Sequence, residues 1–316
     1  MAMTGIFPIV VTGASGKLGQ LVLHELLERG VRPQDIIATS RNTDVLSFWA
    51  GRGVVTRAAD FNRPGPELEQ AFAGGMRALI ISTTPEAPYV KGKRFHQQRN
   101  AIDAAIAAGV PHIFYTSAPN PEPPTPAIWK EDHFLTENHL RASGATWTIL
   151  RHWEWPDWHL EENWLPAISD GVYSTGAGEG RIAHITREDT AAADAGALLS
   201  NDVANSIIDI TGPEALNADE IMAMLSDLIG KPIHVRHLQP QEIAPHLLKQ
   251  GANPDFVPIF EMIAEAIRLG KFDGVTSDAE RLAGRPLVRM AEFLKQALSR
   301  LRSPVRIDAE TNLGRG

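Results

Sequence analysis

The sequence contains no cysteine. This absence excludes disulfide bonds, thiol catalysis, and zinc or iron–sulfur sites that cysteine would hold, and it fits the reducing cytoplasm where we expect the protein to act. Long apolar runs are also missing, since PIVV and ALII are far too short to cross a bilayer. The first residues, MAMTGIFPIVVTG, enter a predicted strand without a signal-peptide pattern.

Positive charge is in deficit. Lysine and arginine total 30 against 38 acidic residues, a formal net charge of -8. This balance gives no electrostatic reason to bind a phosphate backbone or an anionic membrane, so we expect neither nucleic acid nor membrane as a partner. The 316 residues are 43% hydrophobic and 22% charged, which is ordinary for a globular protein with a substantial core.

The first half of the chain alternates short apolar runs with longer amphipathic segments. The runs predict strands at Phe7–Thr12, Ile36–Ser40, Val54–Ala58, Ala78–Ser82, His112–Ser117 and Thr146–Arg151. The segments between them predict helices, including one around residues 43–53, and several end in glycine, as left-handed C-caps favour. Such alternation predicts an α/β fold with a doubly wound parallel sheet covered on both faces.

After Arg151 the alternation breaks. We predict strands at Val172–Thr175, Arg181–Ile185, Ile207–Thr211 and Ile233–His237, helices at Asp189–Leu199 and Ala218–Ile229, and further helices to about Leu301. We interpret residues 152–302 as a smaller C-terminal α+β domain that follows the domain of residues 1–151 and returns some elements to its sheet. The polar, aperiodic residues 303–316 are expected to be disordered.

A glycine-rich turn directly follows the first predicted strand, in Thr12-Gly13-Ala14-Ser15-Gly16-Lys17-Leu18-Gly19. Gly13 permits a tight turn, Gly16 lets the backbone approach a pyrophosphate, and Gly19 lets the helix pack against the strand. The helix N-terminus then offers N–H groups to phosphates. A glycine triplet alone is weak evidence, but this strand–turn–helix context predicts a Rossmann-type dinucleotide-binding domain, the alternative being a turn that binds nothing.

The end of the second strand distinguishes the two nicotinamide cofactors. An acidic residue there would bind the adenosine ribose of NAD, but the chain reads Ala38-Thr39-Ser40-Arg41-Asn42. Arg41 can fork onto a 2′-phosphate and Ser40 can donate a hydroxyl hydrogen bond, so we predict NADPH as the cofactor. The alternative is that Arg41 is a solvated residue at the start of a helix.

These features resemble the NmrA-like atypical short-chain dehydrogenases, and most closely their branch of NADPH-dependent quinone oxidoreductases and triphenylmethane reductases. The resemblance spans about residues 6–300 and rests on SRN, AADF, QQRNAIDAAIAAGVPHIFYTS, EDHFLTENHL, SGATWTILR and GEGRIAHITREDTAAA. It implies a Rossmann domain, a small C-terminal substrate domain and a cleft between them. The positions implied to contact the cofactor are Gly13, Ser15, Lys17, Leu18, Arg41, Asp60, Phe61, Ser82, Thr83, Thr116 and Ser117.

The resemblance also places His133 and Glu137 on the helix that flanks the nicotinamide site. The chain departs from the family there, because Thr136-Glu137-Asn138 stands where many relatives have Thr-Glu-Lys. Its substrate loop is also richer in tryptophan than the family leads us to expect.

The stretch Tyr89-Val-Lys-Gly-Lys93 has the Tyr-x-x-x-Lys spacing of the catalytic pair in standard short-chain dehydrogenases. That pair lies on the helix after the fifth strand, here roughly residues 127–143, which contains no tyrosine. Tyr89 instead follows the fourth strand among prolines, where the two side chains need not share a helical face. We therefore interpret the spacing as accidental and keep Tyr89 as a candidate lining residue of the substrate cleft.

Without the catalytic Tyr-x-x-x-Lys pair, the range of substrates that the protein can reduce is restricted. An isolated ketone needs a positioned proton donor for its alkoxide. Quinones, extended enones and cationic dyes accept hydride into a delocalised product, so positioning can supply much of the catalysis. If a side chain does donate a proton, His133 is the first candidate, followed by Tyr115 and His152; the alternative for His133 is an ordinary helix histidine.

Five of the seven tryptophans lie between residues 147 and 164. Trp153, Trp155 and Trp158 have polar and charged neighbours, which favours a partly open substrate site, with inter-domain packing as the alternative. Trp147 alternates within a strand and is predicted to be core. His133 and His139 are off one helical face and the pair at 234 and 237 lies in a predicted strand, so we predict no metal site.

The sequence therefore predicts an NADPH-dependent reductase that transfers hydride to a small aromatic or quinone-like substrate. Two alternatives remain: a non-catalytic NADP(H) sensor that signals to a protein partner, and an isomerase or epimerase on the same fold. A homodimer is left open.

Overall fold

A seven-stranded parallel sheet forms the centre of the computed structural model, which describes residues 5–84, 90–123 and 128–302. Its strand order is β3-β2-β1-β4-β5-β6-β8, and all six neighbouring pairs are parallel. The strands are β1 (Ile9–Val11), β2 (Ile36–Ser40), β3 (Val55–Ala58), β4 (Arg77–Ile80), β5 (His112–Ser117), β6 (Thr146–His152) and β8 (Ser206–Ile210). The predicted doubly wound Rossmann-type sheet is confirmed.

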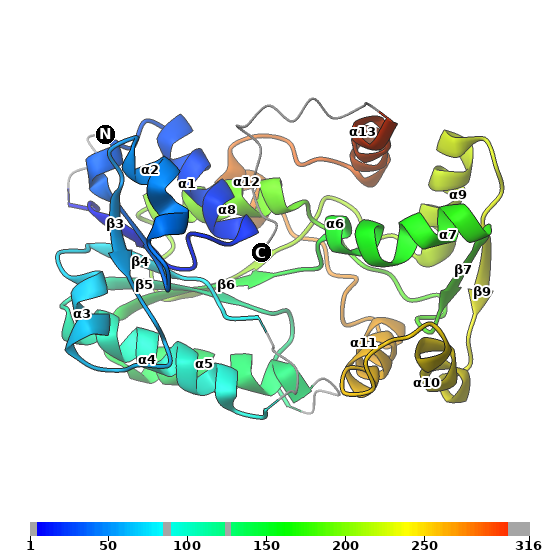
Figure 1. The fold of residues 1–316 in the computed structure, drawn as a ribbon, viewed down its shortest axis with the longest axis horizontal. Coiled ribbons are helices and arrows are strands. Elements are labelled where there is room, and N and C mark those ends of the chain that lie inside the picture. Colours follow the sequence, from blue (N-terminus) through cyan, green and yellow to red (C-terminus); the bar gives the residue numbers. More distant parts are fainter. Residues whose placement is uncertain (1–4, 85–89, 124–127, 303–316) are drawn as a thin grey trace.

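Helices cover both faces of this sheet (Figure 1). One face carries α1 (Lys17–Glu28), α8 (Arg187–Leu199) and α12 (Asp278–Ala283), and the other carries α3 (Pro66–Phe72), α4 (Lys93–Ala107) and α5 (Ile128–Ala142). The strand sequences explain this arrangement. Ile9 and Val11 of β1 point into the core beneath α1, whereas Val10 between them points into the opposite core with Phe72.

A second group of elements forms a cap at one end of the molecule (Figure 1). They are α6 (Pro156–His159), a π-helical turn (Leu160–Trp164), α7 (Leu165–Asp170), β7 (Val172–Thr175), α9 (Ala218–Ile229), β9 (His234–His237), α10 (Pro240–Lys249), α11 (Val257–Arg268) and α13 (Met290–Arg302). β7 and β9 pair in parallel as a separate small sheet. The chain thus leaves the main sheet after β6, returns to it with α8 and β8, leaves for the cap, returns once more with α12, and ends in the cap with α13.

Two predicted elements differ from the structure. Residues 181–185 do not form a strand, because their N–H groups are divided among separate segments: Ile182 donates to Leu216 at 2.9 Å and Ala183 to Phe272 at 2.8 Å. The predicted helix around residues 43–53 is reduced to a 3-10 turn (Asp44–Leu46) and the short α2 (Ser47–Ala50). The predicted disordered tail, residues 303–316, lies outside the described residues.

None of the helices in the described ranges is both long and apolar enough to cross a membrane.

Candidate functional site

The glycine loop between β1 and α1 has the conformation that its sequence requires. Gly13 adopts φ +59°, in the left-handed region that favours glycine, and its carbonyl accepts a hydrogen bond from the Gly16 N–H at 2.9 Å. Gly16 is the N-cap of α1. A Cβ on Gly19 would lie 2.3 Å from the Gly13 carbonyl oxygen, so only glycine lets the helix pack this closely on the loop.

A cavity of about 370 Å³ opens above this loop, at the carboxyl ends of neighbouring parallel strands. This is the place where open α/β sheets bind their ligands. Of the predicted cofactor residues, the cavity is lined by Gly13, Ser15, Gly16, Ser40, Arg41, Asp60, Phe61, Ser82 and Thr83. The Ser40 hydroxyl donates to the Ser15 hydroxyl at 3.0 Å, which ties the end of β2 to the glycine loop.

The part of this cavity next to Arg41 suits a phosphate. Arg41 is exposed at its rim, and no ion pair of Arg41 is found within the described ranges. The residues that directly follow β2, Arg41-Asn42-Thr43, include no carboxylate. The glycine loop and Arg41 together therefore fit the pyrophosphate and the 2′-phosphate of NADPH.

A second cavity of about 540 Å³ adjoins the first, and both are lined by Ile81, Ser82, Thr83 and Thr84. On the sheet side it is also lined by Leu18, Thr116, Ser117, His133 and His152. The cap contributes mainly apolar and aromatic side chains: Trp153, Trp155, Trp158, Phe256, Ile259, Phe260 and Ile263. A flat apolar ligand in this space would lie beside the part of the first cavity that residues 81–84 line.

The three predicted substrate tryptophans line this second cavity but differ in how they are held. Trp158 is 40% exposed, and its ring stacks on Phe260 with centroids 6.4 Å apart. Trp155 donates its indole N–H to Thr190 at 3.1 Å, and Trp153 is buried and donates to Asp209 at 3.3 Å. Trp158 is thus the ring most accessible to a ligand. Trp147 does not line this cavity and packs against the core cluster that includes Phe72.

His133 and Tyr115 belong to one buried hydrogen-bonded chain. Arg94 Nη2 lies 3.0 Å from His133 Nε2, and because a guanidinium only donates, this nitrogen accepts. The proton of neutral His133 is then on Nδ1, which donates to the Tyr115 hydroxyl at 2.7 Å, and Tyr115 donates to Gln98 at 3.0 Å. Burial raises the pKa of Tyr115 well above its usual value. His133 and Arg94 line the second cavity, whereas Tyr115 is fully buried beneath it.

The third candidate donor, His152, is anchored by a buried acid. Its Nε2 lies 2.8 Å from Asp194 Oδ1, and burial raises the pKa of that carboxyl group. His152 lines the second cavity beside Trp153.

A buried ion pair supports the wall formed by Ser117. The Ser117 hydroxyl donates to Glu137 Oε1 at 2.6 Å, and Arg151 grips both carboxylate oxygens, with Nε and Nη2 at 3.0 and 2.8 Å. Glu137 is fully buried and Arg151 is nearly so. Arg151 therefore supplies the positive charge that balances the buried carboxylate of Glu137.

Other predicted residues lie outside the cavity walls. Gly19 is packed under the loop, and Lys17, at the start of α1, forms an ion pair with Glu161 of the π-helical turn at 3.6 Å. Tyr89 lies outside the described residues, and Lys93 is the first residue of α4.

The cavities also contain residues that the sequence analysis missed. They are Thr39, Ala59, Asn62, Ile81, Thr84, Arg94, Gln97, Ala118, Pro119, Glu154 and the α11 side chains. The N-cap Phe256 and the α11 residues 259, 260 and 263 have the spacing of one helical face, but such a face is typical of any core helix. No local feature of the sequence distinguishes a helical face that lines a cavity from one that packs in the core.

The buried His184, which packs against His159 and Trp164, provides a test of pH dependence. Burial, with the nearby His159, lowers the pKa of His184 well below 6.5. In mild acid the unfolded chain therefore binds a proton at His184 that the folded protein does not bind. We expect the free energy of unfolding to fall as the pH drops below about 6.5. His112, whose pKa burial lowers to about 4, adds to this slope.

Urea unfolding of wild type and His184→Gln at several pH values between neutral and mildly acidic checks this. The variant should lose part of the slope and keep the part that His112 contributes. An unchanged slope would show that His184 does not titrate differently in the two states.

Known proteins resemble this chain over nearly its whole length. Residues 13–201 match a family described as NAD(P)H-binding. The chain is 32% identical to quinone oxidoreductase 2 of Escherichia coli over 90% of its own length and 96% of that protein. It is 26% identical to an NmrA-like family domain-containing oxidoreductase of Aspergillus flavus, covering 92% and 94%. The crystal structure of a Citrobacter triphenylmethane reductase with NADP(H) superposes with a TM-score of 0.84 at 30% identity, covering 92% and 100%.

Proposed function

Because the chain belongs to the NAD(P)H-binding, NmrA-like family of oxidoreductases, we propose that it is an NADPH-dependent reductase of quinone-like or similarly conjugated aromatic molecules. The observation that carries this proposal is the pair of adjoining cavities. One is polar and lies over the glycine loop, the other is largely apolar and aromatic, and residues 81–84 line both. Bound NADPH supplies a hydride, and the second cavity is where an acceptor would receive it.

The residues of the first cavity bind and orient the cofactor. The N-terminus of α1 and the glycine loop hold the pyrophosphate, and Arg41 with Ser40 holds the 2′-phosphate. Ser82, Thr83 and Thr116 stand at the junction of the cavities, where the Ser82 N–H already donates to the Thr116 hydroxyl at 2.9 Å. This bond fixes the ends of β4 and β5 relative to each other beside the reacting centre.

Changing Arg41 to aspartate should reverse the cofactor preference. The substitution removes the guanidinium and places a carboxylate beside the 2′-phosphate, so NADPH should bind at least about tenfold more weakly while NADH gains affinity. Fluorescence titrations with both cofactors measure this. Equal affinity of the wild-type protein for NADH and NADPH would contradict the role given to Arg41.

The second cavity favours conjugated acceptors. Trp158 stacked on Phe260, together with Ile259 and Ile263, offers flat apolar surfaces that orient an aromatic ring and keep water from the site. The relatives' names, quinone oxidoreductase and triphenylmethane reductase, agree with such an acceptor. In a delocalised acceptor the added electrons spread over the ring system, so a strong acid beside one oxygen is not essential.

Arg94 supplies the charge that such a reaction needs. Its side chain lines the second cavity, held by a 2.7 Å hydrogen bond from Nε to the Thr83 carbonyl and by its contact with His133. A fixed positive charge in a water-poor site stabilises negative charge that develops on the acceptor. In the hydrogen-bonded chain described above, the protons of neutral His133 and Tyr115 point inward toward Gln98, and α5 contains no tyrosine that would complete a Tyr-x-x-x-Lys pair.

Truncating Trp158 to alanine tests the substrate side of this proposal. We expect KM for an aromatic acceptor to rise about 3- to 10-fold, which corresponds to roughly 0.5–1.5 kcal/mol of lost stacking. NADPH affinity and the melting temperature should change little, because Trp158 is 40% exposed and lies outside the cofactor cavity.

The matched control is Trp164→Ala, since Trp164 is 2% exposed and packs in the cap core. That variant should lower stability by about 3–5 kcal/mol. If Trp158→Ala instead lowers the melting temperature as much as the control and leaves KM unchanged, Trp158 is a packing residue and not a substrate contact.

A further inference from the structure

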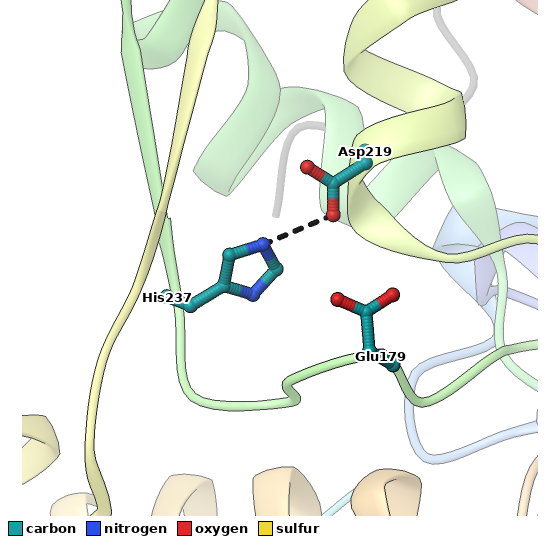
Figure 2. Close-up of side chains that lie close together, drawn as sticks. All are labelled: Glu179, Asp219 and His237. Carbon is teal, nitrogen blue, oxygen red and sulfur yellow. Dashed lines mark ion pairs between the residues drawn. The ribbon is translucent and has the colours of Figure 1, made fainter.

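Three potential metal ligands converge on the surface of the cap, far apart in sequence (Figure 2). Glu179 follows β7, Asp219 lies in the first turn of α9, and His237 ends β9. One ligand atom from each lies within 4.8 Å of the other two, and His237 Nε2 is 3.0 Å from Asp219 Oδ2. We propose that these residues bind a divalent transition-metal ion of the zinc type, with water completing its coordination.

The donor set suits that class of ion. One imidazole nitrogen and two carboxylate oxygens are ligands that zinc and cobalt accept, whereas magnesium and calcium prefer oxygen alone. The donor atoms need only small side-chain rotations to come within the roughly 2.0–2.2 Å bonds of such a site. All three side chains are exposed, so an ion reaches them directly from solvent.

Among the described residues, no lysine or arginine forms an ion pair with either of the two carboxylates. Within the described part of the chain, the ion pair found for Asp219 is with His237, and Glu179 has none. The neighbouring guanidinium of Arg181 is engaged elsewhere, gripping both carboxylate oxygens of Glu220 at 2.8 Å. A divalent cation would therefore balance charge that the cap leaves unpaired.

The elements that present the ligands are themselves fixed. Asn217 caps α9 through a reciprocal pair of 3.0 Å bonds with Glu220, and its amide lies 3.5 Å from Glu179 Oε2, where it can orient that carboxylate. β9 is held to β7 along its length. This support means that little ordering is needed when an ion binds.

The turn that carries Glu179 also packs on the substrate side of the cap. A Cβ on Gly180 would lie 2.4 Å from the Ile267 carbonyl oxygen of α11, whose other residues line the second cavity. An ion shared by Glu179, Asp219 and His237 would thus fasten this turn to α9 and β9. We assign it a stabilising role in the cap, independent of the reductase proposal.

Titration of tag-free protein with Zn²⁺ and Co²⁺ tests the site. We expect one ion per chain by calorimetry, a visible cobalt absorption band, and a raised melting temperature with zinc. His237→Ala should weaken binding by at least about tenfold, because loss of even an outer-shell partner costs about 10–100-fold.

His234→Ala is the matched control, since His234 is exposed on the same strand outside the cluster. It should keep wild-type affinity and the cobalt band. The proposal is wrong if wild type binds no ion saturably, or if His237→Ala and His234→Ala bind equally well. These readouts use no reductase activity, so they stand or fall separately from the proposed function.

Discussion

Replacing Arg151 by leucine is expected to lower the free energy of unfolding by about 3–5 kcal/mol. The reason is the fully buried Glu137, whose carboxylate Arg151 grips at 3.0 and 2.8 Å. Without the guanidinium, Glu137 is left as an uncompensated buried charge, and the Ser117 hydroxyl loses its fixed acceptor. Chemical denaturation at neutral pH measures the loss.

The double variant Arg151→Leu, Glu137→Leu separates charge from packing. Removing both charges should recover much of the stability, because an apolar pair of similar volume often replaces a buried ion pair at little cost. The single variants Arg151→Leu and Glu137→Leu are measured beside it. If the double variant loses as much free energy of unfolding as the two single variants lose in sum, the effect comes from packing and the ion pair has no special role.

Changing Gly19 to alanine should reduce turnover by about 100-fold, the scale of loss that a displacement of about 1 Å produces. The new methyl group would lie 2.3 Å from the Gly13 carbonyl oxygen, a backbone atom that cannot rotate aside. Helix α1 must therefore move away from the loop, and NADPH should bind more weakly. Steady-state kinetics and NADPH titrations report both effects.

Gly16→Ala is the informative comparison. Gly16 has an ordinary φ of -78°, and its Cβ would lie 3.3 Å from the Gly13 carbonyl oxygen, so the fold tolerates it better. We expect it to weaken NADPH binding with a smaller loss of melting temperature than Gly19→Ala. Normal NADPH affinity in both variants would mean that the cofactor does not lie over this loop.

The fold and the cofactor cavity could be predicted because their signals are local. Fully apolar strands such as Ile9–Val11 indicate a sheet covered on both faces, and the glycine spacing fixes where the first helix begins. Parallel strands bring their carboxyl ends to one edge, so Ser40, Asp60 and Ser82 meet in one cavity although they are far apart in sequence.

The rest depended on contacts that no local pattern encodes. Arg94 lies in the first turn of an ordinary amphipathic helix, and only the packing of α4 against α5 directs its side chain to His133 and the second cavity. Residues 181–185 have the composition of a strand but lack a neighbour to pair with along their length. The cluster of Glu179, Asp219 and His237 forms only when β9 pairs with β7, so a search for histidine spacings overlooks it.

The most direct test of the central claim is a spectrophotometric assay of NADPH oxidation with a naphthoquinone acceptor, repeated with NADPH that carries deuterium on its nicotinamide. We predict acceptor-dependent and equimolar loss of NADPH, slowed by the deuterium, with KM raised in Trp158→Ala. Tight NADPH binding without oxidation by quinones, azo dyes or triphenylmethane dyes would contradict the reductase function and favour a protein that only senses NADP(H).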